Sequence, residues 1–264
     1  MANRKNLVLG GSGTIGSVLC KTLLEKGEEV INLDLKMGFD LRKESLLQYD
    51  NVDYVWFLAW EVGGAKFLYN KNHYFDIIHN NTLICQNVFT FLNKTKIPFM
   101  FTSSQLASTN NTYGVTKILG EEWTKILGGK IVRFWNIYSW EEPSEKSHFI
   151  PDIIINALRN KKITLMTNGE EKRQLIYIND CIDNLLHITT LNGTMFHLTN
   201  NKWISIADVA NIIANKLNVK IQKGNQIGYQ CIEEADESHK YFTFKTDLHE
   251  GLHKIIESAK LYLK

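Results

Sequence analysis

A tyrosine and a lysine four positions apart, Tyr113 and Lys117, are the residues of this chain best suited to move a proton. On a helix this spacing places both side chains on one face, one turn apart. A free phenol has a pKa of about 10, too high for a general base at neutral pH. A neighbouring ammonium group favours the phenolate and is expected to lower that pKa, and the hydroxyl of Ser104 could hold a substrate alcohol in line. The same spacing also arises by chance in a chain of this length, so the assignment depends on the elements around it.

A glycine-rich segment near the N-terminus supplies that context. We expect a short apolar strand over 6–9, a glycine-rich turn, an amphipathic helix through Lys26 and a second strand over 29–35 that ends near Asp34. This order is typical of a dinucleotide site, where glycines let the backbone approach the pyrophosphate at a helix N-terminus. The alternative is a plain loop, which would not need a strand, a turn, a helix and an acid in this order. The residues predicted to contact the cofactor are Gly10, Gly13, Thr14, Ile15 and Gly16, whose glycines follow the spacing GxxGxxG.

Two acidic residues beyond this turn bear on which dinucleotide is bound. Asp34 lies where a carboxylate accepts hydrogen bonds from the adenosine ribose and repels a 2′-phosphate, which favours NAD over NADP. Lys36 is close enough in the sequence to oppose that preference. Asp40 and Leu41 follow at a position suited to the edge of the adenine, although a solvated turn explains Asp40 equally well.

A third apolar strand is expected over 52–60. Its C-terminal end should lie at the edge of the sheet that carries the glycine-rich turn. Leu58 and Ala59 in this strand are therefore predicted cofactor contacts. The segment that follows contributes candidate substrate contacts, because paired glycines after a strand allow a ligand to approach the backbone. These contacts are Val62, Gly63 and Gly64.

Helix 74–93 and strand 97–102 complete the surroundings of Tyr113. The helix carries Asn81, and a buried helical asparagine is costly unless it is paired, so a structural capping role is open beside a functional one. The strand delivers Ser103 and Ser104 to the edge that holds the glycine-rich turn. A polar helix start at 110–112 then places Tyr113 and Lys117 in the first turns of the next helix.

Composition excludes several classes of function. The 264 residues carry a formal net charge of +2, which gives no argument for binding nucleic acid or an acidic membrane. The four cysteines are scattered without a CxxC pair, which favours reduced thiols in a cytoplasmic protein over a disulfide framework or a metal site. No signal peptide and no apolar run of membrane-spanning length is visible, so neither membrane insertion nor secretion is expected.

Taken together, these motifs resemble an extended short-chain dehydrogenase/reductase of the nucleotide-sugar epimerase/dehydratase family, from about residue 7 to the C-terminus. The resemblance implies Ser104 as the substrate-orienting hydroxyl, Tyr113 as the acid–base, Lys117 as its partner that also grips the nicotinamide ribose, and Asn81 as support for the lysine. Segment 133–138 matches the family's RxxNxYGP pattern, although Ser139 and Trp140 replace Gly-Pro, and segment 173–180 matches its returning strand. The resemblance implies Asn136 and Arg173 as substrate contacts. For Arg173 the chemistry agrees, because the planar fork of an arginine can grip a diphosphate with two hydrogen bonds.

The implied architecture is α/β, a Rossmann-type doubly wound parallel sheet with a small discontinuous C-terminal substrate-binding cap. Residues 1–138 are predicted to form the NAD-binding domain, with 171–192 returning to it. Residues 139–170 and 193–264 are predicted to form the nucleotide-sugar-binding cap. Family members often dimerise through two helices per subunit, so a homodimer is expected, through helices over 82–92 and 113–126.

Two short motifs narrow the expected substrate to a GDP-sugar. Val62-Gly63-Gly64, read with Asn80-Asn81-Thr82, resembles GDP-fucose synthase and GDP-mannose 3,5-epimerase. Segment 147–151, Ser-His-Phe-Ile-Pro, resembles a segment of GDP-fucose synthase whose histidine is an acid catalyst. His148 is therefore a candidate substrate contact, with a plain pocket or surface histidine as the alternative.

Departures from the family pattern decide between reactions. Gln105 and Leu106 stand where 4,6-dehydratases carry an acid–base pair, and no cysteine adjoins the serines as in 3,5-epimerising enzymes. What is retained serves one alcohol–ketone hydride transfer. We therefore expect an NAD-dependent GDP-hexose or GDP-heptose 4-dehydrogenase that supplies a 4-keto sugar for surface polysaccharide synthesis. The alternatives are a nucleotide-sugar 4-epimerase or 4-ketoreductase and, in a different class, a non-catalytic NAD-binding sensor or scaffold.

Overall fold

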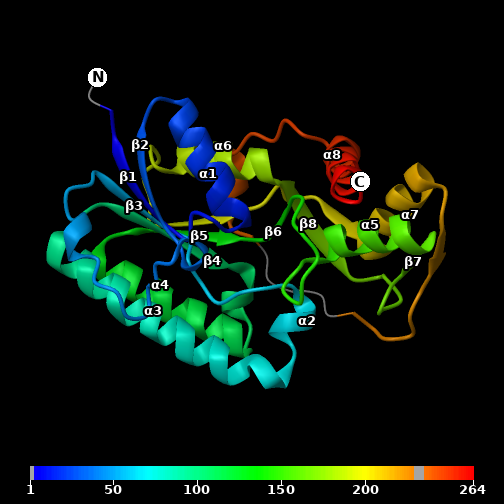
Figure 1. The fold of residues 1–264 in the computed structure, drawn as a ribbon, viewed down its shortest axis with the longest axis horizontal. Helices are drawn as coiled ribbons and strands as arrows, with labels where there is room; N and C mark the ends of the chain where they lie inside the picture. Colours follow the sequence, from blue (N-terminus) through cyan, green and yellow to red (C-terminus); the bar gives the residue numbers. More distant parts are fainter. Residues whose placement is uncertain (1–2, 229–234) are drawn as a thin grey trace. The chain divides into compact units, whose positions relative to one another are not determined.

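The structure is a computed structural model that describes residues 3–228 and 235–264 (Figure 1). Its contacts group the chain into two compact units. The first comprises Met1–Val62, Asn70–Phe134 and Ile182–His197, and the second comprises Gly63–Tyr69, Trp135–Cys181 and Leu198–Lys264. Cys20, Cys85 and Cys181 are free and buried, and Cys231 lies outside the described residues.

The first unit is built on a six-stranded sheet in the order β2-β1-β3-β4-β5-β9. The pairings of β1 with β2 and β3, of β3 with β4 and of β4 with β5 are parallel. This sheet confirms the predicted Rossmann-type α/β fold. The strands are β1 (Lys5–Leu9), β2 (Glu29–Leu33), β3 (Tyr54–Phe57), β4 (Phe99–Ser104), β5 (Lys130–Phe134) and β9 (Met195–Leu198).

Long helices cover both faces of this sheet. Figure 1 shows α3 (Tyr74–Thr95) and α4 (Thr112–Leu127) side by side on one face and α1 (Thr14–Glu25) on the other. The rings of Phe57, Phe89 and Phe101 meet between α3 and the sheet, with centroids 5.3 to 6.0 Å apart. Burying such rings supplies much of the free energy that holds a helix on a sheet.

Two local features fix the start and the depth of α4. The side chain of Asn111 caps the helix by accepting a hydrogen bond from the amide of Gly114 at 2.8 Å. Gly120 faces the ring of Phe101, where an added Cβ would lie only 2.4 Å from a ring carbon. The helix backbone therefore lies directly on β4, which carries Ser103 and Ser104.

The second unit contains two small sheets and a separate core. β10 (Trp203–Ser205), β8 (Lys172–Tyr177) and β6 (Asn136–Tyr138) form one sheet, and β11 (Lys220–Gln222) pairs with β7 (Lys162–Thr164) in the other. Isoleucine, leucine and alanine side chains of three helices build its core. These helices are α5 (Phe149–Asn160), α7 (Ile206–Leu217) and α8 (Leu248–Tyr262).

The remaining elements are short or span the two units. α2 (Ala65–Leu68) belongs to the second unit, and α6 (Ile178–Ile188) contains the boundary between Cys181 and Ile182. Single 3₁₀ turns are η1 (Leu35–Met37), η2 (Leu47–Tyr49), η3 (Lys71–His73), η4 (Gln105–Ser108) and η5 (Glu237–Tyr241).

Several boundaries differ from the sequence-based expectations. The third strand ends at Phe57, because the amides of Leu58 and Ala59 turn to donate to the carbonyl of Leu9. Ser103 and Ser104 lie within β4, where they pair with β5. Residues 171–181, expected with the sheet of the first unit, group with the second because β8 pairs with β6 and β10; residues 193–197 group with the first through β9.

Two searches of the described residues found no candidate. None of their helices is long and apolar enough to cross a membrane. None of their histidine, cysteine and acidic side chains gather in groups of three that could hold a metal ion.

Candidate functional site

The glycine-rich turn after β1 is shaped for close backbone contact. Gly10 has a φ of +87°, and a Cβ there would lie 2.7 Å from the amide nitrogen of Ala59. A Cβ on Gly16 would lie 2.2 Å from the carbonyl oxygen of Gly10. The turn therefore packs against both α1 and the segment after β3, and no described side chain caps the start of α1 at Gly13. Such a helix start fits a pyrophosphate.

Asp34 follows β2 and is oriented by the backbone. Its carboxylate accepts hydrogen bonds from the amides of Ser12 at 3.0 Å and Lys36 at 2.8 Å. The ammonium of Lys36 donates to the carbonyl of Ser12 at 3.2 Å. The carboxylate is thus fixed beside the glycine-rich turn, as the NAD prediction requires, and Lys36 lies at the same place.

Asp40 has a strong partner that the sequence did not indicate. The guanidinium of Arg42 donates to both of its carboxylate oxygens, at 2.8 and 2.9 Å, and also to the side-chain oxygen of Asn80 at 3.1 Å. The hydrogen bonds from Arg42 lower the pKa of Asp40 to about 2. Asp40 is therefore an ion-paired, buried residue and not a solvated turn acid; its contact with adenine, like that of Leu41, stays a prediction.

Tyr113 and Ser104 are brought together by the tight passage from β4 to α4. A Cβ on Gly114 would lie 2.1 Å from the carbonyl oxygen of Leu106, so only glycine lets η4 pack against the first turn of α4. Both Tyr113 and Ser104 are buried. Burial raises the pKa of the Tyr113 phenol, and a hydrogen bond with Ser104 opposes the rise.

Lys117 lies one turn beyond Tyr113 and is only 3% exposed. Its Nζ donates to the carbonyl oxygen of Thr102 at 2.6 Å and lies 5.7 Å from the centroid of the Tyr113 ring. Burial lowers the pKa of Lys117 to about 7, which nearby Cys85 and Glu121 oppose. The sequence-based expectation of a phenol with a lowered pKa is not met in this structure, because the desolvation of Tyr113 has the larger effect.

Asn81 of α3 is fully buried and is paired through its amide group. Its oxygen accepts from the amide of Glu61 at 2.6 Å, and its nitrogen donates to the carbonyl of Glu61 at 3.2 Å and to the hydroxyl of Thr116 at 3.4 Å. These bonds tie the segment after β3 to α4. Asn81 has no direct hydrogen bond with Lys117 among the contacts described, and its support of the lysine stays a prediction.

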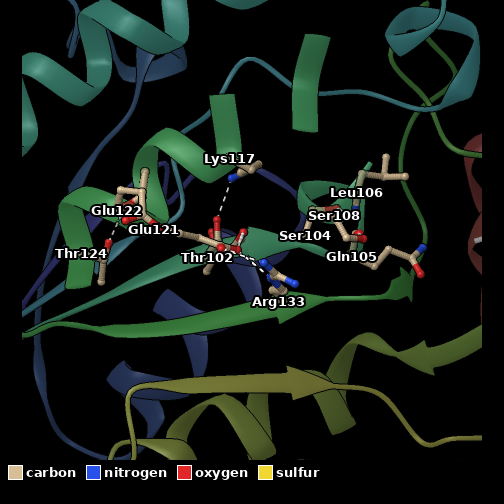
Figure 2. A network of polar contacts seen from close by, with 12 residues as sticks. Thr102, Ser104, Gln105, Leu106, Ser108, Lys117, Glu121, Glu122, Thr124 and Arg133 are labelled. Atoms are coloured by element: carbon tan, nitrogen blue, oxygen red, sulfur yellow. Dashed lines mark hydrogen bonds and ion pairs between the residues drawn. The ribbon is translucent and has the colours of Figure 1, made fainter. Parts of the chain in front are cut away.

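A second buried network lies near Lys117, and Figure 2 shows its members Glu121 of α4 and Arg133 of β5. Ser103 of β4 is its third member. Arg133 donates to both oxygens of Glu121, at 2.7 and 2.8 Å, and Ser103 donates to the same carboxylate. Glu121 is 1% exposed, so this pairing offsets the cost of burying its charge. The network fixes α4 against β4 and β5 at the level of Ser104.

The glycine pair of the second unit has a packing role there. A Cβ on Gly64 would lie 2.3 Å from the carbonyl oxygen of Ser147, and one on Gly63 would lie 3.0 Å from the Cβ of Lys146. The amide of Gly64 donates to the carbonyl of Lys146 at 2.9 Å. Gly63 and Gly64 therefore let this loop lie against the segment that carries His148. Val62 is exposed in the first unit.

His148 begins α5 and is paired with Glu141. Its Nδ1 lies 2.8 Å from the carboxylate of Glu141, and its side chain is 52% exposed. Burial lowers the pKa of His148, but the hydrogen bond and charge of Glu141, with the charge of Asp152, outweigh this and raise it. The raised pKa favours the protonated imidazole, a form that suits either an acid catalyst or a phosphate contact.

The other two substrate candidates lie on strands of the second unit. Asn136 begins β6, and its side-chain nitrogen is buried without a hydrogen-bond partner among the described residues. A buried donor of this kind is costly, which favours a ligand contact. Arg173 lies in β8 opposite Ile204 and donates to the carbonyl of Lys172 at 2.8 Å.

Two residues near Lys117 were missed from the sequence. Glu121 lies four positions after Lys117 on α4, so its spacing could have indicated it. Trp60 has no such signal, because it meets Lys117 only through the folding of the segment after β3. Its ring centroid lies 4.2 Å from Nζ of Lys117.

Comparisons with known proteins agree with this geometry. A family model described as the NAD dependent epimerase/dehydratase family matches residues 6–197. An uncharacterized UDP-glucose epimerase of Bacillus subtilis is 27% identical over 226 residues, covering 67% of this chain and 70% of that protein. A putative UDP-glucose 4-epimerase of Methanocaldococcus jannaschii is 22% identical, over 96% of this chain and 98% of that protein. The solved UDP-glucuronic acid 4-epimerase of Bacillus cereus, in complex with UDP-glucuronic acid and NAD, has a TM-score of 0.84 at 19% identity, over 98% of this chain and 99% of that one.

The orientation of Asp34 yields a test of cofactor choice. We expect the protein to bind NADH more tightly than NADPH, because a carboxylate fixed beside the glycine-rich turn is suited to accept from a ribose diol and repels a 2′-phosphate. Asp34→Ser should narrow the difference, since it removes the repulsion and leaves Lys36 in place. Fluorescence titration with both reduced cofactors measures this, with Asp50→Ser as a control on an exposed acid. Equal or tighter NADPH binding by the unmodified protein would show that Asp34 does not select NAD.

Proposed function

Because the chain belongs to the NAD dependent epimerase/dehydratase family, as the match over residues 6–197 shows, we propose that it oxidises or reduces the C4 position of a nucleotide-activated sugar. Membership confirms the resemblance noted from the sequence and makes the chain an NAD-dependent enzyme, so the sensor or scaffold alternative is not retained. The cofactor fits the residues present. Gly10 and Gly16 have no room for a side chain, so the backbone of the turn packs tightly at the uncapped start of α1, and Asp34 is oriented beside this turn.

The observation that carries the proposal is the joining of Tyr113, Ser104 and Lys117 in one buried cluster. In the oxidative direction Tyr113 would take the proton of the O4 hydroxyl, and bound NAD would accept the hydride from C4, so that the C4–O4 bond would become a carbonyl. Ser104 holds O4 in line, and the charge of Lys117 favours the phenolate. NAD supplies the hydride chemistry, and the protein supplies placement and electrostatics.

Within this chemistry we favour net oxidation to a 4-keto sugar over epimerisation. An epimerase must retain the ketone while the sugar turns over, which requires a closed and roomy pocket. Here only the short η4 turn and Thr109 to Asn111 connect Ser104 to α4. We expect so short a connection to form only a thin wall of the sugar pocket, which favours release of the ketone. The 4-epimerase and the 4-ketoreductase remain the alternatives.

The nucleotide of the substrate has two candidates, GDP and UDP, and separate observations support each. Two short motifs, at 62–64 with 80–82 and at 147–151, resemble enzymes of GDP-sugars. The packing of Gly64 against Ser147 accounts for part of the first motif without any ligand. The named relatives are described as enzymes of UDP-glucose. GDP- and UDP-sugars are therefore both substrates to be assayed, and surface polysaccharide synthesis is the proposed use of the product.

We also propose that the protein is a homodimer through α3 and α4. Along α4 the exposed apolar side chains recur at helical spacing, and α3 adds two near its start. A patch of this kind on a water-facing helix pair marks an interface with another protein surface. Its members are Phe75, Ile78, Val115, Ile118, Leu119, Trp123 and Ile126.

The first test of the proposed function removes the general base. Tyr113→Phe should lower turnover by roughly 10²- to 10⁴-fold, because the phenol is the group that exchanges the O4 proton. NAD affinity should change little, since Lys117 and the glycine-rich turn remain. Turnover of NAD with a panel of GDP- and UDP-sugars measures the first quantity, and Tyr262→Phe on α8 of the second unit provides the control. Near-normal turnover of Tyr113→Phe would disprove the assignment.

The second test distinguishes oxidation from epimerisation. A suitable nucleotide sugar should reduce NAD and yield a product that has lost two hydrogens, because the ketone is released. Mass spectrometry after brief incubation in deuterated buffer, corrected for hydration of the ketone, identifies the product. A product of unchanged mass with inverted C4 would overturn the preference for a dehydrogenase and establish the epimerase.

The third test concerns the dimer. Light scattering on the unmodified protein should give twice the mass of the chain, and Val115→Glu with Ile118→Glu should give the single mass, because charges on this patch cannot be buried without a partner. Leu261→Glu, at a position that is 69% exposed on α8, should leave the dimer intact. A monomeric unmodified protein, or an intact dimer in the double variant, would contradict the proposal.

A further inference from the structure

Trp60 places an aromatic face against the ammonium of Lys117. Nζ lies 4.2 Å from the centroid of the Trp60 ring and 4.9 Å from that of Phe101. Both distances lie within the range of cation–π attraction, for which tryptophan is the most effective residue. The hydrogen bond to the carbonyl of Thr102 completes this surrounding. Among the described residues, the ammonium thus lies against one carbonyl and three rings, of which that of Tyr113, at 5.7 Å, is the most distant.

The indole is locked in this position from two sides. Its Nε1–H donates to the hydroxyl of Thr116 at 3.1 Å, and that hydroxyl donates to the carbonyl of Tyr113 at 2.7 Å. The ring also packs against Phe101 and Phe57, with centroids 5.1 and 5.8 Å away. Asn81 holds the backbone of the next residue, Glu61, through two hydrogen bonds. Trp60 therefore cannot turn away from Lys117 without breaking these contacts.

The charged and titratable groups described near Lys117 do not pair with its ammonium directly, so an aromatic ring can add to its stabilisation. On α4 these groups are Tyr113 and Glu121, and the charge of Glu121 is shared with Arg133 of β5. On α3 the group is Cys85, whose pKa burial raises to about 12, so it is a neutral thiol at physiological pH. After β3 the group is Glu61, whose carboxylate accepts from Asn80. No carboxylate among the described residues forms a salt bridge with Lys117, so the rings act in addition to the more distant charge of Glu121.

We propose that Trp60 is a positioning residue for Lys117, and that its indole face stabilises the ammonium and keeps it beside Tyr113. The inference rests on the proposed function, since it concerns the lysine of the same site. A ring without charge can do this at no cost of burying a second ion. It leaves the phenol of Tyr113 free of a competing carboxylate. Thr116 and Asn81 then act one step further out, by holding Trp60.

The test follows the proton of Lys117 itself. In protein labelled with [ε-¹³C]lysine, the resonance that disappears in Lys117→Met is titrated against pH in the full-length protein. Trp60→Leu should lower the pKa of Lys117 by roughly one unit, because the ring favours the charged form. Trp60→Phe retains an aromatic ring, so the pKa of Lys117 should stay close to that in the unmodified protein. Trp203→Leu, in the second unit, is the control that should leave the titration unchanged.

A second set of variants keeps the shape of the side chain. Tryptophans with increasing numbers of ring fluorines, introduced at position 60, weaken the negative face of the indole with little change in size. The pKa of Lys117 should fall step by step with each fluorine. If the pKa of Lys117 in Trp60→Leu and throughout the fluorinated series equals that in the unmodified protein, the proposal is overturned. Because the titration reads only the lysine proton, an inactive protein that shows the predicted steps would contradict the proposed function and leave this inference standing.

Discussion

The burial of one positive charge, the ammonium of Lys117, is the constraint on which the site depends. A buried lysine is costly, and its pKa falls unless nearby groups favour the charged form. The fold supplies these groups from three directions: the Thr102 carbonyl of β4, the rings of Trp60 and Phe101, and the more distant charge of Glu121. Lys117 reaches these groups because Gly120 lets α4 lie directly on β4.

The same burial governs Tyr113. In this structure burial raises the pKa of the phenol and lowers the pKa of Lys117 to about 7. The spacing of the two residues is therefore not sufficient to give Tyr113 the lowered pKa of a general base. Burial is the largest cause of both shifts, opposed by the hydrogen bond with Ser104 at Tyr113 and by Cys85 and Glu121 at Lys117. A cofactor and a substrate that change the surroundings of these buried groups would therefore change both pKa values.

Much of this arrangement could be predicted from the sequence, because it is local. The order of strand, glycine turn, helix and acid identifies the dinucleotide site at Gly10 and Asp34, and helical spacing joins Tyr113 to Lys117. The parts that could not be predicted depend on contacts between distant segments. The sequence shows neither that Trp60 meets Lys117 nor that Arg42 occupies the carboxylate of Asp40. Likewise, β8 was expected to return to the large sheet, but its partners are β6 and β10, which only the folded second unit brings together.

The central claim is that Tyr113, Ser104 and Lys117 support hydride transfer from C4 of a nucleotide sugar to NAD. It is tested most directly with a nucleotide sugar that carries deuterium at C4, quenched during turnover and analysed by mass spectrometry of the cofactor. The account predicts that deuterium appears on the nicotinamide ring and that turnover is slower than with the unlabelled sugar. Turnover at an unchanged rate, with the deuterium retained on the sugar or lost to water, would contradict it.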